Sequence, residues 1–292
     1  MSETAHEIAS QPARWRQAVT RAGAESMTLP QPGERVAIVG CGTSWFIGQA
    51  YAALREASGH GPTDAFAASE APTDRSYDRW VALSRSGTTT EVVRLLEELP
   101  RDAVSVAITA VPGTPIPDAA GLSVLLEFAD ETSVVQTRFA TTALALLRAH
   151  LGEDLTGAIA DAEVALAEPL PADVTAFDHF VFLGHGWSVG LANEAALKMR
   201  EAAQAHTESY PAMEYRHGPV SLAGPSTLVW ILETGDPAVA ADIRTTGATV
   251  IEATMDPMAV LVQAQRAAVA VAEARGLDPD HPKHLTRSVV LS

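Results

Sequence analysis

Short apolar segments alternate with amphipathic segments along most of the chain. The run RVAIVG at residues 35–40 has no polar face, as expected for a strand buried on both sides, and a Gly turn and a helical pattern follow it. The same order recurs at residues 80–99, and the apolar runs at 104–110 and 121–128 predict two further strands. Strands that alternate with helices predict an α/β fold with a doubly wound parallel sheet of the flavodoxin-like kind. Such sheets bind ligands at the carboxyl ends of their strands.

The second half of the chain repeats the order of the first. Its strand–turn–helix unit at 180–202 matches the unit that begins at residue 35. The turn residues of the two units lie 144 positions apart: Gly184, Gly186 and Ser188 against Gly40, Gly42 and Ser44. We therefore expect two tandem three-layer α-β-α domains, at 35–166 and 167–292, after an N-terminal helical segment at 1–34.

Charge and composition exclude several classes of protein. A formal net charge of −16 argues against binding to nucleic acids or anionic membranes, because both attract basic patches. No run approaches the roughly 18 apolar residues that a spanning helix needs, and the first thirty residues do not resemble a signal peptide. Cys41 is the only cysteine, which fits a reducing compartment. We expect a cytoplasmic protein with no nucleic-acid or membrane partner.

Hydroxyl side chains gather where two of the predicted strands end. SRSGTTTE at 84–91 follows the apolar run WVAL, and Thr43 and Ser44 follow the first strand. Hydroxyl donors, with the free N–H groups and the positive dipole of a helix start, can hold an anion. The equivalent stretch of the second half, ETGDPAVA, carries acids instead, so we expect the anion in the first half only. A structural interpretation stays open, in which a threonine caps the helix and Glu91 completes a capping box.

Three charged residues share one face of a predicted helix in the second half. Glu194, Lys198 and Glu201 follow the spacing i, i+4 and i+7, and the opposite face is apolar. The helix begins at the carboxyl end of a strand, beside the expected ligand crevice. The spacing is compatible with acid–base catalysis, although such spacing by itself normally favours a solvated stripe of ion pairs.

Together these motifs resemble the sugar isomerase (SIS) family. The resemblance rests on CGTS at 41–44, on SRSGTTTE, and above all on the run from Glu194 to the HGP at 217–219. It is strongest to the isomerase half of glucosamine-6-phosphate synthase and to related aminosugar-phosphate deaminases and deglycases, and it extends from about residue 35 to the end. It implies two SIS domains, a homodimer with active sites shared between subunits, and a phosphosugar substrate. It also implies the residues that surround the phosphate: Gly42, Thr43, Ser44, Ser84, Arg85, Ser86 and Thr89.

The resemblance further implies roles for the acid–base groups. Glu201 matches the family's proton-shuttling glutamate, with Lys198 and Glu194 beside it. His217 matches a ring-opening histidine that reaches across from the partner subunit. An imidazole suits that task, because opening a hemiacetal takes a proton from one oxygen and delivers it to another near neutral pH. The alternative for an isolated HGP is turn packing.

Three departures from the family pattern affect the expected reaction. The tail lysine that forms a Schiff base with the ketose is Arg287 here, and arginine is a poor imine nucleophile. Arg287 is expected to contact substrate oxygens or phosphate instead, with Lys283 as a less favoured nucleophile. The family's mid-chain lysine is Arg138. The synthase's amidotransferase domain has no counterpart in these residues, so amination from glutamine is not expected.

The sequence thus predicts an aldose–ketose isomerase or deaminase that acts on a hexose or aminohexose 6-phosphate without a metal or another cofactor. Glu201 transfers the proton between C1 and C2, and His217 opens the ring. Two alternatives stay open, a fructosamine-6-phosphate deglycase and a non-catalytic phosphosugar sensor that binds a partner protein.

Overall fold

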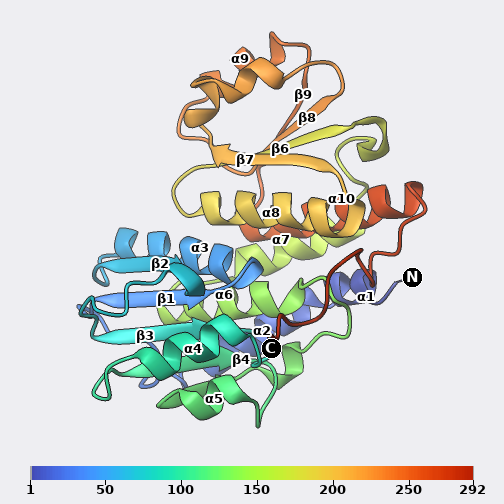
Figure 1. The fold of residues 1–292 in the computed structure, drawn as a ribbon. Helices are drawn as coiled ribbons and strands as arrows, with labels where there is room; N and C mark the ends of the chain where they lie inside the picture. The colour runs from blue at the N-terminus through green and yellow to red at the C-terminus, as the bar shows by residue number, and fades with distance from the viewer. Residues whose placement is uncertain (1, 292) are drawn as a thin grey trace. The chain divides into compact units, whose positions relative to one another are not determined.

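A computed structural model describes residues 2–291 and divides them into two compact units (Figure 1). The first unit contains residues 10–155 together with a tail segment, residues 285–291. The second unit contains residues 2–9 and 156–284. The boundary that the sequence predicted between residues 166 and 167 remains a proposal for the domain limits, since compactness alone divides the chain at 155.

The first unit is built on a five-stranded parallel sheet. Its strand order is β2-β1-β3-β4-β5, the flavodoxin-like order that the alternating pattern predicted. The strands are β1 (Val36–Gly40), β2 (Thr63–Ala67), β3 (Arg79–Leu83), β4 (Ser105–Thr109) and β5 (Leu122–Leu125). The helices are α2 (Gln11–Ala22), α3 (Thr43–Ala57), α4 (Thr90–Glu98), α5 (Pro115–Ala119) and α6 (Arg138–His150).

Apolar residues cover both faces of this sheet. Ala37, Val39 and Ala82 pack on one face against α4 and α5, in a core that also contains Trp80. In Figure 1, α3 and α6 lie on the opposite side of the sheet from α4 and α5. All five residues of β1, β3 and β4 are buried, because helices cover both of their faces.

The second unit has a four-stranded parallel sheet in the order β7-β6-β8-β9. Its strands are β6 (His179–Gly184), β7 (His206–Pro211), β8 (Thr227–Ile231) and β9 (Thr249–Glu252). Its helices are α1 (Glu3–Ala9), α7 (Thr156–Ala167), α8 (Ser188–Ala203), α9 (Ala238–Arg244) and α10 (Pro257–Ala274), and short 3₁₀ turns, η4 (Glu214–Arg216) and η5 (Pro219–Leu222), follow β7. Figure 1 shows α8 and α10 on one face of this sheet and α9 on the other. The two parallel sheets confirm the α/β class.

Glycines let the first helix of each sheet approach the strand before it. A Cβ on Gly40 would lie 2.7 Å from Cβ of Ser44, and a Cβ on Gly184 would lie 2.5 Å from the backbone of Ser188. Real Cβ atoms do not come this close, so only glycine allows these turns. They carry α3 and α8 directly away from the carboxyl ends of β1 and β6. Within residues 2–291, the helices are too short or too polar to cross a bilayer.

Candidate functional site

The hydroxyl stretch after β3 forms a buried turn. Ser84, Arg85 and Ser86 are each at most 6% exposed. The side-chain oxygens of Ser84 and Thr89 lie 3.3 Å apart, whereas the Thr89 side chain makes no capping bond to α4 in the described chain. The Thr88 amide donates to Oγ of Ser86 at 3.2 Å, and the hydroxyl oxygens of these two residues lie 3.1 Å apart. The hydroxyls therefore face one another and do not cap the helix as the structural alternative required.

A second hydroxyl pair lies at the end of the neighbouring strand. β1 pairs with β3 from Val36 to Val39, and the chain after β1 continues into α3 through Thr43 and Ser44. Both hydroxyl residues are 5% exposed. Because parallel strands end at the same edge of a sheet, the two hydroxyl turns share the carboxyl edge of the first unit, as the sequence predicted. Gly42, which directly precedes Thr43, has φ +52°, a conformation that favours glycine.

The side chain of Arg85 donates hydrogen bonds to backbone carbonyl groups. Its Nη1 donates to the carbonyls of Ser133 and Val134, at 3.0 and 3.3 Å, and its Nη2 donates to the carbonyl of Arg287 at 2.7 Å. The carboxylate of Glu131 lies 3.9 Å from Nη1. The guanidinium thus joins the hydroxyl turn, the segment before α6 and the tail segment.

Arg287 faces the first unit and forms an ion pair with Asp130. Its Nε also donates to the carbonyl of Glu131 at 3.1 Å. The next residue, Ser288, accepts hydrogen bonds from Ser86 and Thr88, at 3.0 and 2.8 Å. The tail segment therefore lies directly on the hydroxyl turn.

Glu131, which was not predicted from the sequence, contacts the start of α6 and lies close to Arg85 and Arg287. This carboxylate is 2% exposed. It accepts from the amide and the hydroxyl of Thr137, and from the amides of Arg138 and Phe139, at the start of α6. A carboxylate at a helix N-terminus is stabilised by those amides and by the helix dipole. Nothing in its local sequence signals the role, because its cationic neighbour Arg85 is 46 positions away. Arg138 itself donates to the carbonyl of Asp130 at the same junction.

The second unit holds the predicted acid–base residues on α8. Nζ of Lys198 lies 3.4 Å from Oε1 of Glu194 and 2.5 Å from Oε2 of Glu201. Lys198 and Glu194 are 1% and 0% exposed, while the side chain of Glu201 is 20% exposed. Such burial contradicts the alternative of a solvated stripe. Burial lowers the pKa of the adjacent Arg200, and the two carboxylates oppose that shift.

His217 is exposed on the turn that follows β7. The residues before it fix the turn: Tyr215 is fully buried, and Arg216 forms ion pairs with Asp236 and Asp242, at 3.1 and 2.6 Å. The imidazole of His217 is therefore exposed to solvent on a turn that these contacts hold in place. The phosphate candidates belong to the first unit, whereas Glu194, Lys198, Glu201 and His217 belong to the second.

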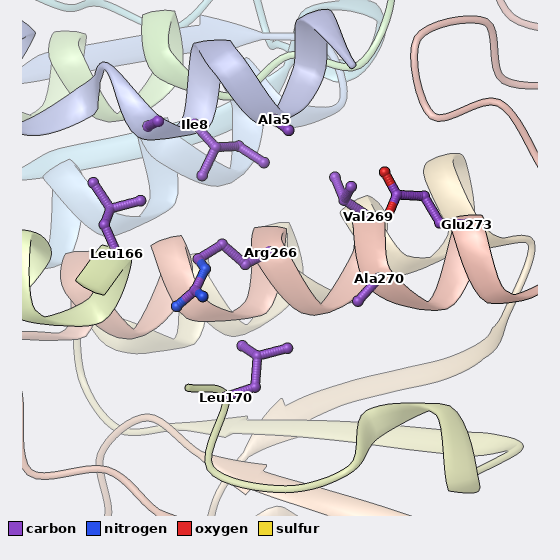
Figure 2. Close-up of a pocket in the computed structure, with 9 residues that line it drawn as sticks. Ala5, Ile8, Leu166, Leu170, Arg266, Val269, Ala270 and Glu273 are labelled. Atoms are coloured by element: carbon purple, nitrogen blue, oxygen red, sulfur yellow. The ribbon is translucent and has the colours of Figure 1, made fainter. Parts of the chain in front are cut away.

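An apolar groove of about 560 Å³ in the second unit is a different feature (Figure 2). It lies among α1, α7 and α10 and is lined by Ala5, Ile8, Ala9, Leu166, Leu170, Arg266, Val269, Ala270 and Glu273. Arg266 points between Leu166 and Leu170 in Figure 2, and its guanidinium donates to the carbonyls of Ala165 and Glu168. None of the predicted site residues lines this groove.

The described residues contain no group of three or more His, Cys, Asp and Glu side chains that could hold a metal ion. Burial raises the pKa of Cys41 to about 11, and Glu91 adds to the rise. The thiol is therefore protonated near neutral pH and is a poor nucleophile.

No protein-family model matches the sequence. It is similar to isomerizing glutamine–fructose-6-phosphate aminotransferases from Bacteroides thetaiotaomicron and Aeropyrum pernix. Each is 28% identical, over 88% and 72% of this chain. The matched regions are 51% and 43% of those proteins, so the chain spans about half the length of the curated relatives it matches.

Solved structures resemble the chain over its whole length. A glucosamine-6-phosphate deaminase from Thermotoga maritima matches with a TM-score of 0.83 and 26% identity, covering 99% of this chain and all of that one. A tagatose-6-phosphate ketose/aldose isomerase from Escherichia coli shares the fold, with a TM-score of 0.85 at 21% identity, over 100% and 96% of the two chains. The resemblance to the sugar isomerase family is therefore confirmed: the chain has its sequence relatives among the isomerizing aminotransferases and its fold in common with phosphosugar isomerases and deaminases.

Proposed function

We propose that the protein is a sugar-phosphate aldose–ketose isomerase or aminosugar-phosphate deaminase that acts on a hexose or aminohexose 6-phosphate. The observation that carries this proposal is the buried Lys198 with its two carboxylates, of which only Glu201 retains access to solvent. The full-length similarity to a glucosamine-6-phosphate deaminase supports the same reaction class.

Glu201 transfers one proton between neighbouring carbons of the open-chain sugar. Its carboxylate takes the proton from C2 of the aldose and returns it to C1, while a second proton passes from the heteroatom on C2 to O1. The aldehyde thereby becomes an alcohol, and C2 of the aldose becomes the carbonyl carbon. In an aminosugar the same transfer leaves an imine at C2, which water hydrolyses to the ketone and ammonia. The ammonium of Lys198, 2.5 Å away, orients the carboxylate.

The hydroxyls of Ser44, Ser84, Ser86 and Thr89 hold the phosphate ester. Two features support this assignment: the side chains gather at the carboxyl edge of the first sheet, and α4 begins beside them. Anions bind well at such helix starts, because the first amide groups have no partner within the helix.

His217 opens the sugar ring in the active site of a second copy of the chain. Its exposure on an anchored turn supports this role, since an imidazole that serves another subunit must face outward from its own. The protein is then a homodimer, and each catalytic centre needs residues from both copies.

Replacing Glu201 with Gln tests the proposal. The amide cannot accept the proton, so we expect turnover of the best substrate to fall by about 10²–10⁴-fold while the affinity for sugar phosphate stays within about twofold. Glu201→Asp keeps the charge on a shorter side chain and should retain intermediate activity. Glu273→Gln, an exposed carboxylate of the same unit, is the matched control and should behave as wild type. Unchanged turnover in Glu201→Gln would reject the role of Glu201.

A panel of substrates separates the reactions within this class. Glucosamine 6-phosphate, galactosamine 6-phosphate and phosphorylated fructose–amino acid conjugates are assayed for ammonia or amino acid release, and fructose 6-phosphate for isomerisation. Release of ammonia assigns a deaminase, and release of an amino acid assigns a deglycase. Tight binding of these compounds without any conversion would overturn the enzymatic proposal in favour of a phosphosugar sensor.

A further inference from the structure

The tail segment, residues 285–291, occupies the hydroxyl turn of the first unit. Figure 1 shows the red C-terminal segment ending close to α4. The contacts extend along the segment: the carbonyl of Arg287 binds Arg85, the Ser288 hydroxyl binds Ser86 and Thr88, and the carbonyl of Val289 binds the amide of Thr90 at 3.2 Å.

Ser288 uses the donors that an anion would need. Its Oγ accepts from the hydroxyls of Ser86 and Thr88, at 3.0 and 2.8 Å. A hydroxyl has one proton to donate, so Ser86 cannot donate to Ser288 and to a phosphate oxygen at the same time. Phosphate oxygens accept hydrogen bonds in the same way as Oγ of Ser288, but they are charged and therefore the stronger acceptors.

The start of α4 is also covered. Thr90 is the first residue of α4, and its amide is one of those that lack a partner within the helix. Here it donates to the carbonyl of Val289, and the amide of Leu291 donates to Oγ1 of Thr90 at 2.9 Å. One hydroxyl of the proposed phosphate site, that of Ser86, and one amide of the helix start, that of Thr90, are therefore bonded to the tail segment.

We infer that the tail segment is an internal competitor for the phosphate site, with Ser288 Oγ in the place of a phosphate oxygen. This inference rests on the proposed function, because it takes the hydroxyl turn to be the phosphate site. Arg85 holds the segment in place through the carbonyl of Arg287, and the ion pair between Arg287 and Asp130 secures it further. This attachment keeps Ser288 at a high effective concentration beside Ser86. A phosphate ester must displace Ser288 to bind, so its apparent affinity is reduced by the fraction of molecules that are closed.

Replacing Ser288 with Ala in the full chain tests the inference. The variant loses two hydrogen bonds of the closed state, so its apparent Kd for glucose 6-phosphate and for inorganic phosphate should fall by about 2- to 10-fold, as measured by titration calorimetry. Val290→Ala, an exposed residue of the same segment, is the matched control and should bind as wild type. In wild type, saturating phosphate should speed hydrogen exchange at the amide of Leu291, because displacement of Ser288 loosens its bond to Thr90.

A third variant separates this inference from the proposed phosphate site. Weaker phosphate binding in Ser86→Ala supports the proposed phosphate site. If Ser288→Ala then binds phosphate as wild type does, or more weakly, the tail segment does not compete for that site. Slower exchange at Leu291 on adding phosphate contradicts competition in the same way. If Ser86→Ala and wild type bind phosphate equally, the proposed phosphate site itself fails, and the inference fails with it.

Discussion

The buried hydroxyl of Tyr215 is a local weakness in the turn that carries His217. Tyr215 is fully buried, and its Oη has no hydrogen-bond partner among residues 2–291. Its ring packs against Tyr210, with centroids 5.8 Å apart. Burial raises the pKa of Tyr215 to about 12, and the carboxylate of Glu208 and the neighbouring Tyr210 add to the rise. The apolar ring therefore anchors the turn, while the hydroxyl loses hydration without a replacement bond.

We predict that Tyr215→Phe stabilises the protein by about 1 kcal/mol, because it removes an unpaired buried group and keeps the ring. The pKa of an unfolded tyrosine is near 10, below the value of about 12 for folded Tyr215, so ionisation favours the unfolded chain and stability falls as the pH rises from 10 toward 12. Denaturant unfolding between pH 8 and 12 should show a smaller alkaline loss in the variant. Tyr77→Phe is the control and should lower stability, since the Tyr77 hydroxyl donates to Asp64 at 2.6 Å. A loss of stability in Tyr215→Phe at pH 8 would contradict the prediction.

At the scale of residues, a shared helix face could be predicted from the sequence, whereas contacts between distant residues could not. The spacing of Glu194, Lys198 and Glu201 predicted a shared helix face, and the structure confirms it. The contacts of Arg85 could not be predicted, because its partner Arg287 lies 202 positions away. In the sequence, an arginine among hydroxyl residues indicates a site for an anion. In the structure, the guanidinium of Arg85 donates to backbone carbonyl groups instead. The roles assigned to the phosphate and acid–base residues stay predictions.

At the scale of elements, the buried strands and the edge strand β5 could be predicted, but the edge strands β2 and β7 could not. β1, β3, β4 and β8 are buried along their whole length, because helices cover both faces of each, and each contains an apolar run. The edge strands β2 and β7 read TDAFA and HTESYP and are partly exposed, so neither gives an apolar run that signals a strand.

The close turn between β6 and α8 leads to a prediction about Gly184. A Cβ there would lie 2.5 Å from the backbone of Ser188, so Gly184→Ala must push α8 away from β6. Overpacking of this kind costs about 1–3 kcal/mol, and the shift also displaces Glu201 on the same helix. We expect lower stability in thermal unfolding together with reduced turnover.

Gly157 offers the matched control for that variant. It lies in α7 of the same unit, and a Cβ there meets no atom within 4 Å. Gly157→Ala should therefore raise stability by about 0.5–1 kcal/mol, because alanine favours the helix. Equal effects of the two substitutions would show that backbone contact at Gly184 is not what requires glycine.

At the scale of the molecule, each chain end belongs to the unit built from the other half of the sequence. The amide and the hydroxyl of Thr4 both donate to Asp280, each at 2.7 Å, although the residues are 276 positions apart. The tail segment in turn lies on the first unit. A prediction of two domains as consecutive segments could not place the chain ends in this way. Single hydrogen bonds between distant polar residues leave no periodic pattern in the sequence. The duplication and the predicted domain limits stay predictions.

The proposed homodimer makes a prediction that needs two variants. If His217 serves the partner's catalytic centre, a dimer of one Glu201→Gln chain and one His217→Ala chain has one centre with both defects and one with neither. Refolding the two inactive variants together at equal amounts gives mixed dimers as about half of the population, so about a quarter of wild-type activity should return. Each variant refolded alone is the control and should stay inactive. If mixing restores no activity although mixed dimers form, His217 acts within its own chain, and its exposure on the turn has another cause.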